Sequence, residues 1–339
     1  MSTRTRWVAG ATVLLLGITY CVFQFTAKNK LTEGSIKGFV TQIHEHSGAV
    51  VTWKRELCVV RLGADRIAVR LRKKLPHVTY PQAFDFHPTA PMLAFSYFDV
   101  ESPGFNAFVM SSMDGSELSQ NRVHDGLVTA IKFNSNREEL ITAGTTTNEI
   151  VAGQAELRFS NISSLTVSRV PLRLSALALC IATSSTSELI AIGDVSGAVH
   201  VWNDRNLDVV STWREDQTDV ASAGVYSIEF TSDGTGLLVA GGHGVSIRDA
   251  RSGEVRHMCG SQGECVSAIF ADRDQQLVCF TDRQGLWAWN IRTGTHKKIR
   301  SYGKYDVGRL AAANEYEHLY LAVGNSIEYL AAPTLTDEP

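Results

Sequence analysis

Short apolar stretches with period-two alternation recur along most of the chain, and each recurrence keeps the same order. An alternating apolar strand is followed by a polar turn, a second apolar strand ending in small residues, a tight turn and a third strand. The clearest copies are residues 225–250 and 266–291, which start 41 residues apart. Looser copies occupy residues 82–110, 177–203 and 308–330, and another begins at Val128 with a longer insertion at its second turn. Such patterning predicts stacked antiparallel sheets.

Glycine-containing dipeptides separate many of these stretches and fit tight reversals between antiparallel strands. They are Asp114-Gly115, Ser196-Gly197, Asp233-Gly234, Ser252-Gly253 and Thr293-Gly294. Beyond the N-terminal segment, no stretch has the pattern of a long amphipathic helix, which excludes a parallel α/β fold. The chain is therefore predicted to be all-β.

The two ends of the repetitive region each leave a unit incomplete. Residues 308–330 supply only three strands, whereas residues 39–46 form a strand with no unit of its own. Residues 49–74 fill one more unit, which gives seven in all. We expect the strand at 39–46 to pair with the C-terminal strands and close a ring, because closure removes exposed sheet edges.

Residues 7–27 form an uncharged apolar segment after the basic tail 1–6. A helix of this length rises about 30 Å, enough to cross the hydrocarbon layer. A cleaved signal peptide usually has a shorter apolar core and a small-x-small site, but Phe25 stands where a small residue is needed before Ala27. We expect a transmembrane anchor or uncleaved signal at 7–27, a linker at 28–35, one sheet domain at 36–333 and a tail at 334–339.

The orientation of this anchor is weakly specified by charge. Two bases of the tail and the α-amine are nearly matched by three lysines after the apolar segment. A short basic tail before an apolar stretch usually stays on the cytoplasmic side. The sheet domain is therefore expected on the non-cytoplasmic side of a membrane.

A repeat of roughly 40–45 residues with four strands per unit resembles the WD40 family of β-propellers. The Trp-Asp ending of that family has degenerate counterparts at Trp202-Asn203, Arg248-Asp249 and Trp289-Asn290. Its turn aspartate matches Asp194 and Asp282, whereas His243 occupies that place in the copy at 225–250. Of its Gly-His pairs, only His44 and His124 come close. The resemblance implies a seven-bladed propeller in which Asp194, Asp282, Trp202, Trp289 and Asp249 hold the blade turns.

The charge balance argues against broad nucleic-acid binding. The formal net charge is −3, and removing the four bases of the first 30 residues leaves 28 basic against 35 acidic residues. Nucleic-acid binding usually needs a basic surface. The basic runs 70–74 and 295–300 are expected to be solvated strand edges.

The cysteines lack the spacing of a disulfide framework or a metal site. Most of the six are expected to be buried strand residues, and only Cys259 and Cys265 are close enough in sequence to pair across a turn. His44 and His46 flank Glu45, but a metal site needs three or four converging ligands. No metal or cofactor is expected.

Catalytic motifs are also lacking in the sequence. The segment 241–244 (GGHG) is followed by a strand rather than a helix, so it is interpreted as a tight turn and not as a phosphate loop. No G-x-S-x-G string is present. Trp287 and Trp289 share a face and fit either packing between blades or an aromatic anchor for a partner. Asn161 fits a glycosylation acceptor if the domain lies in a eukaryotic lumen.

The sequence favours a non-catalytic scaffold that binds protein or peptide partners at a membrane. The alternative is a propeller enzyme, either quinoprotein-dehydrogenase-like or lactonase-like, with a site in the central channel. A third hypothesis is a membrane-tethered propeller that acts as a guanine-nucleotide exchange factor. Such proteins also combine a propeller with a membrane anchor, but their anchor is at the other end of the chain. The scaffold hypothesis depends partly on analogy of fold, which is a weak argument for function.

Overall fold

The computed structural model describes residues 36–331, except for 43–46, 53–55, 63–66, 75–77, 100–103, 135, 147–154, 215–223, 260–263, 273, 283, 303–306, 314–317 and 324–325. In this part of the chain all regular structure is β, as the sequence predicts. The N-terminal anchor at 7–27 and the tail at 334–339 lie outside the described residues. Among the described residues, no helix is long and apolar enough to span a bilayer.

The strands form seven antiparallel sheets in chain order. Sheet 1 holds β1 (Ile36–Gln42), β2 (Ser47–Thr52), β3 (Glu56–Leu62) and β4 (Ile67–Lys74). Sheet 2 holds β5 (Val78–Phe86), β6 (Met92–Asp99), β7 (Gly104–Ser111) and β8 (Glu117–His124). Sheet 3 holds β9 (Val128–Asn134), β10 (Glu139–Thr145), β11 (Ala155–Asn161) and β12 (Leu172–Leu174). Sheet 4 holds β13 (Ala178–Thr183), β14 (Leu189–Asp194), β15 (Ala198–Asn203) and β16 (Val209–Arg214).

The remaining sheets follow the same meander. Sheet 5 holds β17 (Val225–Phe230), β18 (Gly236–Gly241), β19 (Gly244–Asp249) and β20 (Val255–Cys259). Sheet 6 holds β21 (Cys265–Phe270), β22 (Leu277–Asp282), β23 (Gly285–Asn290) and β24 (His296–Ser301). Sheet 7 holds β25 (Val307–Ala313), β26 (His318–Val323) and β27 (Ser326–Ala331), and it has three strands where the others have four.

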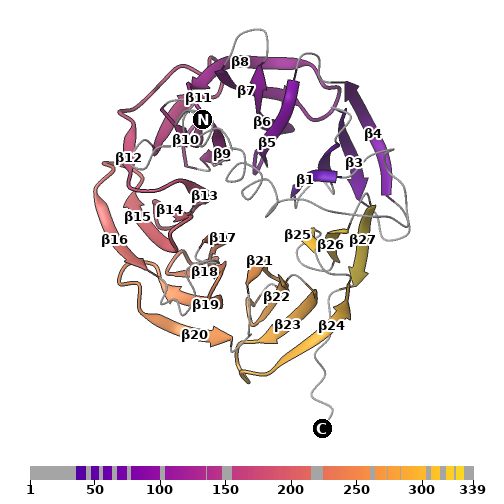
Figure 1. The fold of residues 1–339 in the computed structure, drawn as a ribbon, viewed down its shortest axis with the longest axis vertical. Coiled ribbons are helices and arrows are strands. Elements are labelled where there is room, and N and C mark those ends of the chain that lie inside the picture. Colours follow the sequence, from indigo (N-terminus) through magenta and orange to yellow (C-terminus); the bar gives the residue numbers. More distant parts are fainter. Residues whose placement is uncertain are drawn as a thin grey trace, which may run out of the picture.

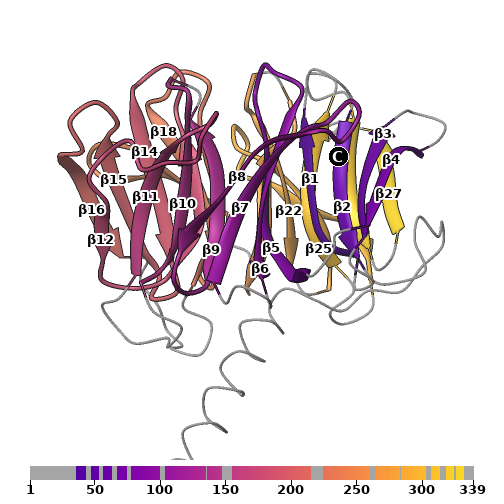
Figure 2. The same cartoon turned by 90° about the horizontal axis from the view of Figure 1, so that it is seen from above.

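The seven sheets stand around a common axis, and this arrangement fits a β-propeller (Figures 1 and 2). The first strand of each sheet is innermost, and each innermost strand lies beside the next around the ring, including β25 beside β1. The last strand of each sheet faces outward. The basic run 70–74 lies on the outermost strand β4, and all but the first residue of the run 295–300 lies on the outermost strand β24, where exposed and part-buried side chains alternate or follow one another.

The predicted closure of the ring by a shared sheet is wrong. The strand expected at 39–46 is part of β1, which pairs with β2 and not with the C-terminal strands. Residues 47–74 supply strands two to four of sheet 1, so β1 completes that sheet instead. Pairing across a four-residue connection loses little chain entropy, which favours the local partner over a distant one. Sheets 1 and 7 close the ring by lying side by side.

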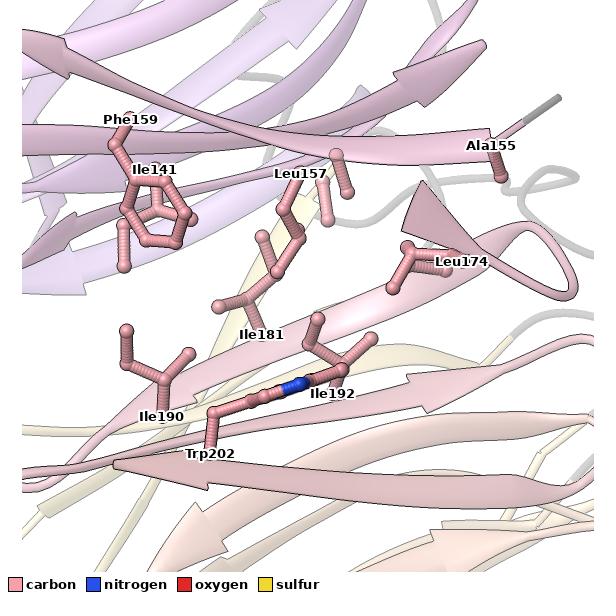
Figure 3. Packing of buried hydrophobic residues seen from close by; sticks show 12 residues of the cluster. Ile141, Ala155, Leu157, Phe159, Leu174, Ile181, Ile190, Ile192 and Trp202 are labelled. Atoms are coloured by element: carbon pink, nitrogen blue, oxygen red, sulfur yellow. The ribbon is translucent and has the colours of Figure 1, made fainter. Parts of the chain in front are cut away.

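The core consists of apolar side chains between neighbouring sheets. Figure 3 shows this packing between sheets 3 and 4, where Leu157 and Phe159 of β11 point toward Ile190, Ile192 and Trp202 of sheet 4. Successive side chains of a strand point toward opposite neighbouring sheets, so both faces of the strand contribute side chains to the core. The period-two pattern of the sequence therefore reflects burial on both faces.

In each of sheets 2 to 6, a turn of the same type connects the third strand to the fourth. The last residue of the third strand is polar, and its side chain accepts a hydrogen bond from a backbone N–H two or three residues later: Ser111, Asn161, Asn203, Asp249 and Asn290. The residue four positions later has a positive φ: Gly115, Leu165, Leu207, Gly253 and Gly294. Polar side chains of this kind stabilise turns by replacing a backbone partner.

Candidate functional site

Asp194 closes the turn between β14 and β15 and is 1% exposed. Its Oδ1 accepts hydrogen bonds from the Ser196 and Ala198 N–H groups at 2.8 and 3.0 Å, and its Oδ2 lies 3.3 Å from His200 Nε2. The His200 ring stacks on Trp202, with centroids 5.6 Å apart. Burial raises the pKa of Asp194, but the hydrogen bonds from His200, Ser196 and Ala198 outweigh it and lower the pKa overall.

Asp282 repeats this arrangement in sheet 6 with a different partner. Trp287 takes the place of His200, and its Nε1–H donates to Asp282 Oδ2 at 2.8 Å. The Trp287 ring stacks on Phe280 with an interplanar angle of 3°. Trp289 is 1% exposed and packs with side chains of sheet 5. The two tryptophans thus pack between sheets, as one of the two sequence interpretations holds.

Asp249 caps the turn after β19. It accepts from the Arg251 and Ser252 N–H groups and from Arg256 Nη2, the last at 2.6 Å. These hydrogen bonds, led by that of the Ser252 N–H, lower the pKa of Asp249 to about 2. The five residues singled out by sequence therefore lie in three sheets and hold local turns and cores. The structure does not gather them into one site.

His124 joins sheets 2 and 3 through a buried polar contact. Its Nε2 lies 3.0 Å from Thr142 Oγ1, and Glu156 approaches Nδ1 at 3.7 Å. Burial, aided by the positive charge of Arg158, lowers the pKa of His124 to about 3, so the ring is neutral near pH 7. The His124–Thr142 contact joins β8 of sheet 2 to β10 of sheet 3.

A cluster that the sequence analysis missed lies on the innermost strands. Asp85 of β5 is buried, and its two carboxylate oxygens accept from Lys132 Nζ and from the Phe133 N–H, both at 2.8 Å. Burial raises the pKa of Asp85, and the charge of Lys132 opposes that shift. Burial lowers the pKa of the neighbouring His87. These contacts tie sheet 2 to sheet 3 near the axis.

Glu229 lies on β17, the innermost strand of sheet 5. Its Oε2 accepts from the Phe270 N–H of the next sheet at 3.3 Å, as Asp85 does from Phe133. Burial raises the pKa of Glu229 to about 7, against the opposing effects of the Phe270 N–H and the positive charge of Lys132. One signal was present in the sequence, since a charged residue directly precedes Phe86, Phe133 and Phe230 near the ends of β5, β9 and β17.

A second buried ionic cluster joins sheets 3 and 4 at their turns. Asp204 is 1% exposed and accepts from Asn134 Nδ2 at 3.0 Å and from Arg169 Nη2 at 2.9 Å. Arg169 also pairs with Glu139 and lies over the Phe159 ring, 4.2 Å from its centroid. Each charged side chain of this cluster has a partner of opposite charge, so we expect the cluster to hold sheets 3 and 4 in a fixed position relative to each other.

Several further expectations concern ligands and thiols. Among the described residues, no group of three or more His, Cys, Asp and Glu side chains is placed to hold a metal. Cys259 and Cys265 are thiols buried in one apolar cluster. The 241–244 segment is a tight turn between β18 and β19, as predicted. His44 and His46 lie outside the described residues. Asn161 caps a turn, and its glycosylation stays a prediction.

Exposed apolar side chains gather on the outward-facing strands. Of the large hydrophobic residues exposed in the described part of the chain, all except Val195 lie on an outermost strand or on the turn that leads to one: Val69, Met113, Leu118, Val167, Val170, Val209, Val255 and Met258. We call this set the apolar rim. No family model matches the sequence, and no curated protein matches it either.

Proposed function

We propose that the chain is a WD40-like, seven-bladed propeller that residues 7–27 tether to a membrane, and that it acts as a non-catalytic scaffold for protein or peptide partners. The propeller lies on the non-cytoplasmic side in this proposal, and it binds neither nucleic acid nor a cofactor. Seven sheets around an axis support the fold. The repeated turn capped by Asn203, Asp249 and Asn290 supports the WD40-like part, because these residues stand where the family has its aspartate.

The observation that carries the scaffold function is the apolar rim. When another protein covers exposed apolar side chains, the apolar surface removed from water supplies a large part of the free energy of association. Met113 and Leu118 are each about half exposed, at 50% and 48%, and lie on the turn before β8 and on β8 itself. The rim extends over sheets 1 to 5, so it offers several contact points on one rigid body.

Site-specific photocrosslinking tests the scaffold function. A photoreactive residue at position 113 or 118 of the full-length protein, in membranes from its own source, should capture a defined protein. The same group at Ser163, on an exposed turn of sheet 3, serves as the control. Loss of all crosslinks above this control, together with turnover of a small molecule by the purified protein, would refute the scaffold function. Protease protection on intact membranes tests the orientation separately.

The enzymatic alternative is favoured by one observation, the carboxyl of Glu229 near the axis with a pKa raised to about 7. Perturbed carboxyls of this kind are common in active sites. Lactone hydrolysis or quinone-dependent oxidation by the purified protein, abolished by Glu229→Gln with the fold intact, would establish the enzyme and displace the scaffold. Activity that survives this substitution would place the chemistry elsewhere.

A further inference from the structure

Within the described part of the chain, sheet 7 has three strands, and the outer edge of the third, β27, lies on the outside of the ring. β27 pairs with β26 on one side, and no described residue pairs with its other side. Figure 1 shows β27 on the rim between β24 and β4, where sheets 1 to 6 each carry a fourth strand. Alternate N–H and C=O groups along such an edge point away from the sheet and can pair with another strand.

β27 has the composition of a covered strand. Its sequence, SIEYLA, contains one charged residue, whereas the outermost strands β4 and β24 contain RLRKK and HKKIR. Ile327 is 2% exposed. The single charge, Glu328, accepts from Arg300 Nη1 at 2.5 Å and from Tyr302 Oη–H at 2.7 Å. Open edges are usually protected by lysine, proline or bulges, and β27 has neither lysine nor proline.

Basic side chains of β24 flank the edge on one side. Lys297 lies opposite Ala288 and Arg300 opposite Leu286 in the β23–β24 register. Ala288 and Leu286 belong to the core cluster shared with Leu310 of sheet 7. Since directly opposed side chains share a face of a sheet, Lys297 and Arg300 lie on the face of sheet 6 that is turned toward sheet 7. Both are exposed.

Basic side chains of β4 flank the edge on the other side. Leu71 and Lys73 contact sheet 2, with Lys73 Nζ 2.8 Å from the Gly115 carbonyl oxygen. Arg72 and Lys74 alternate with them along the strand and so lie on the opposite face, the one toward sheet 7. Both are exposed. The edge of β27 is thus set between two pairs of bases, on a protein whose net charge is negative.

We propose that the edge of β27 binds an extended acidic segment of a partner protein as the fourth strand of sheet 7. This inference rests on the scaffold function and specifies the chemistry of the partner and its place on the ring. Main-chain hydrogen bonds to β27 supply the pairing, as in other cases of strand addition. Aspartate or glutamate side chains on the two faces of the added strand reach Lys297 and Arg300 on one side and Arg72 and Lys74 on the other.

Fluorescence anisotropy tests the proposal on the full-length protein in nonionic detergent. The probe is a labelled nine-residue peptide in which pairs of valine alternate with pairs of glutamate, because this order places glutamate on both faces of an added strand. Saturable binding that weakens as salt rises is the expected result. The double variant Lys74→Glu/Lys297→Glu should weaken binding at least tenfold. The control Arg173→Glu/Arg251→Glu changes the net charge equally on exposed positions away from β27 and should leave binding unchanged.

A peptide of the same charge with N-methylated alternate residues, made in both registers, separates strand pairing from attraction between charges. Its binding should be lost, because each methyl group removes a donor and blocks the edge. Equal binding of the methylated and unmethylated peptides would overturn the proposal. Absent binding together with slow amide exchange of β27 in the free protein would also overturn the proposal, because another segment of this chain or a second copy then covers the edge. Sedimentation velocity distinguishes these two occupants, since a second copy raises the molecular mass. If crosslinking at Met113 and Leu118 captures a partner while the peptide does not bind, the scaffold function stands and only this inference fails.

Discussion

Replacing Glu229 with glutamine tests the electrostatics of the innermost strands directly. The side chain is partly buried on β17, and its Oε2 accepts from the Phe270 N–H of sheet 6. Glutamine keeps an oxygen acceptor for that N–H and removes the ionisable group. The substitution therefore isolates the free energy of placing a negative charge at this position.

The magnitude follows from the pKa of Glu229, which burial raises from 4.5 to about 7. A group whose pKa is higher in the folded state keeps its proton longer there than in the unfolded chain. Its contribution to stability is full below about pH 4.5, declines as the pH rises, and is lost above about pH 7. A pKa that is roughly 2.5 higher in the folded state corresponds to about 3–4 kcal/mol at most, because a difference of one in pKa is worth about 1.4 kcal/mol.

Urea unfolding followed by tryptophan fluorescence at several pH values from 4 to 8.5 measures the effect. The difference in unfolding free energy between Glu229→Gln and wild type should move by up to about 3 kcal/mol in favour of the variant between pH 4 and pH 8. Glu254→Gln, at an exposed turn of the same sheet, controls for the loss of a surface carboxylate. A difference that is constant with pH, or one that moves in favour of wild type as pH rises, would refute the assigned burial cost.

Two further predictions concern turns and buried charges. Gly253 and Gly294 occupy equivalent turns with φ of 76° and 72°, but only an added Cβ at Gly253 would meet a neighbour, the Trp213 ring, at 2.7 Å. Alanine at either position should lower the free energy of unfolding by about 1–2 kcal/mol, because a side chain strains this backbone conformation. At position 253 the clash with Trp213 should add about 1–3 kcal/mol to this loss. Thermal unfolding measures both variants, and equal losses would contradict the contact. Asp204→Ala should cost about 3–5 kcal/mol, because it removes a buried carboxylate that pairs with the part-buried Arg169 and accepts from the buried Asn134. A loss no larger than that of the exposed Asp208→Ala would show that this ionic cluster does not stabilise the packing of sheets 3 and 4.

The local pattern of apolar and polar residues was sufficient to predict strands and turns, but it did not predict which strands pair with each other. The copies at 225–250 and 266–291 correspond to the first three strands of sheets 5 and 6, because burial on alternating faces leaves its mark in every strand. The role of β1 was misassigned, since the same strand could pair with β2 or with the C-terminal strands. That choice depends on the relative cost of chain closure, which composition does not record.

The candidate sites divide in the same way. Asp194, Asp282 and Asp249 act within their own turns, so the resemblance to short WD40 motifs was enough to single them out. Asp85 and Glu229 act on the neighbouring sheet, through the N–H groups of Phe133 and Phe270.

The sequence by itself determined an all-β chain of repeated antiparallel units with capped turns, because strand alternation and turn chemistry are local properties. Only the tertiary structure decided which strand completes each sheet, which charges meet near the axis, and that no described residue pairs with the outer edge of β27 between the bases of β4 and β24. The first outcome depends on the small entropy cost of the short connection between β1 and β2. The other two depend on contacts between residues far apart in the sequence, such as Asp85 and Phe133, and the free energy of such contacts exists only once the ring has assembled.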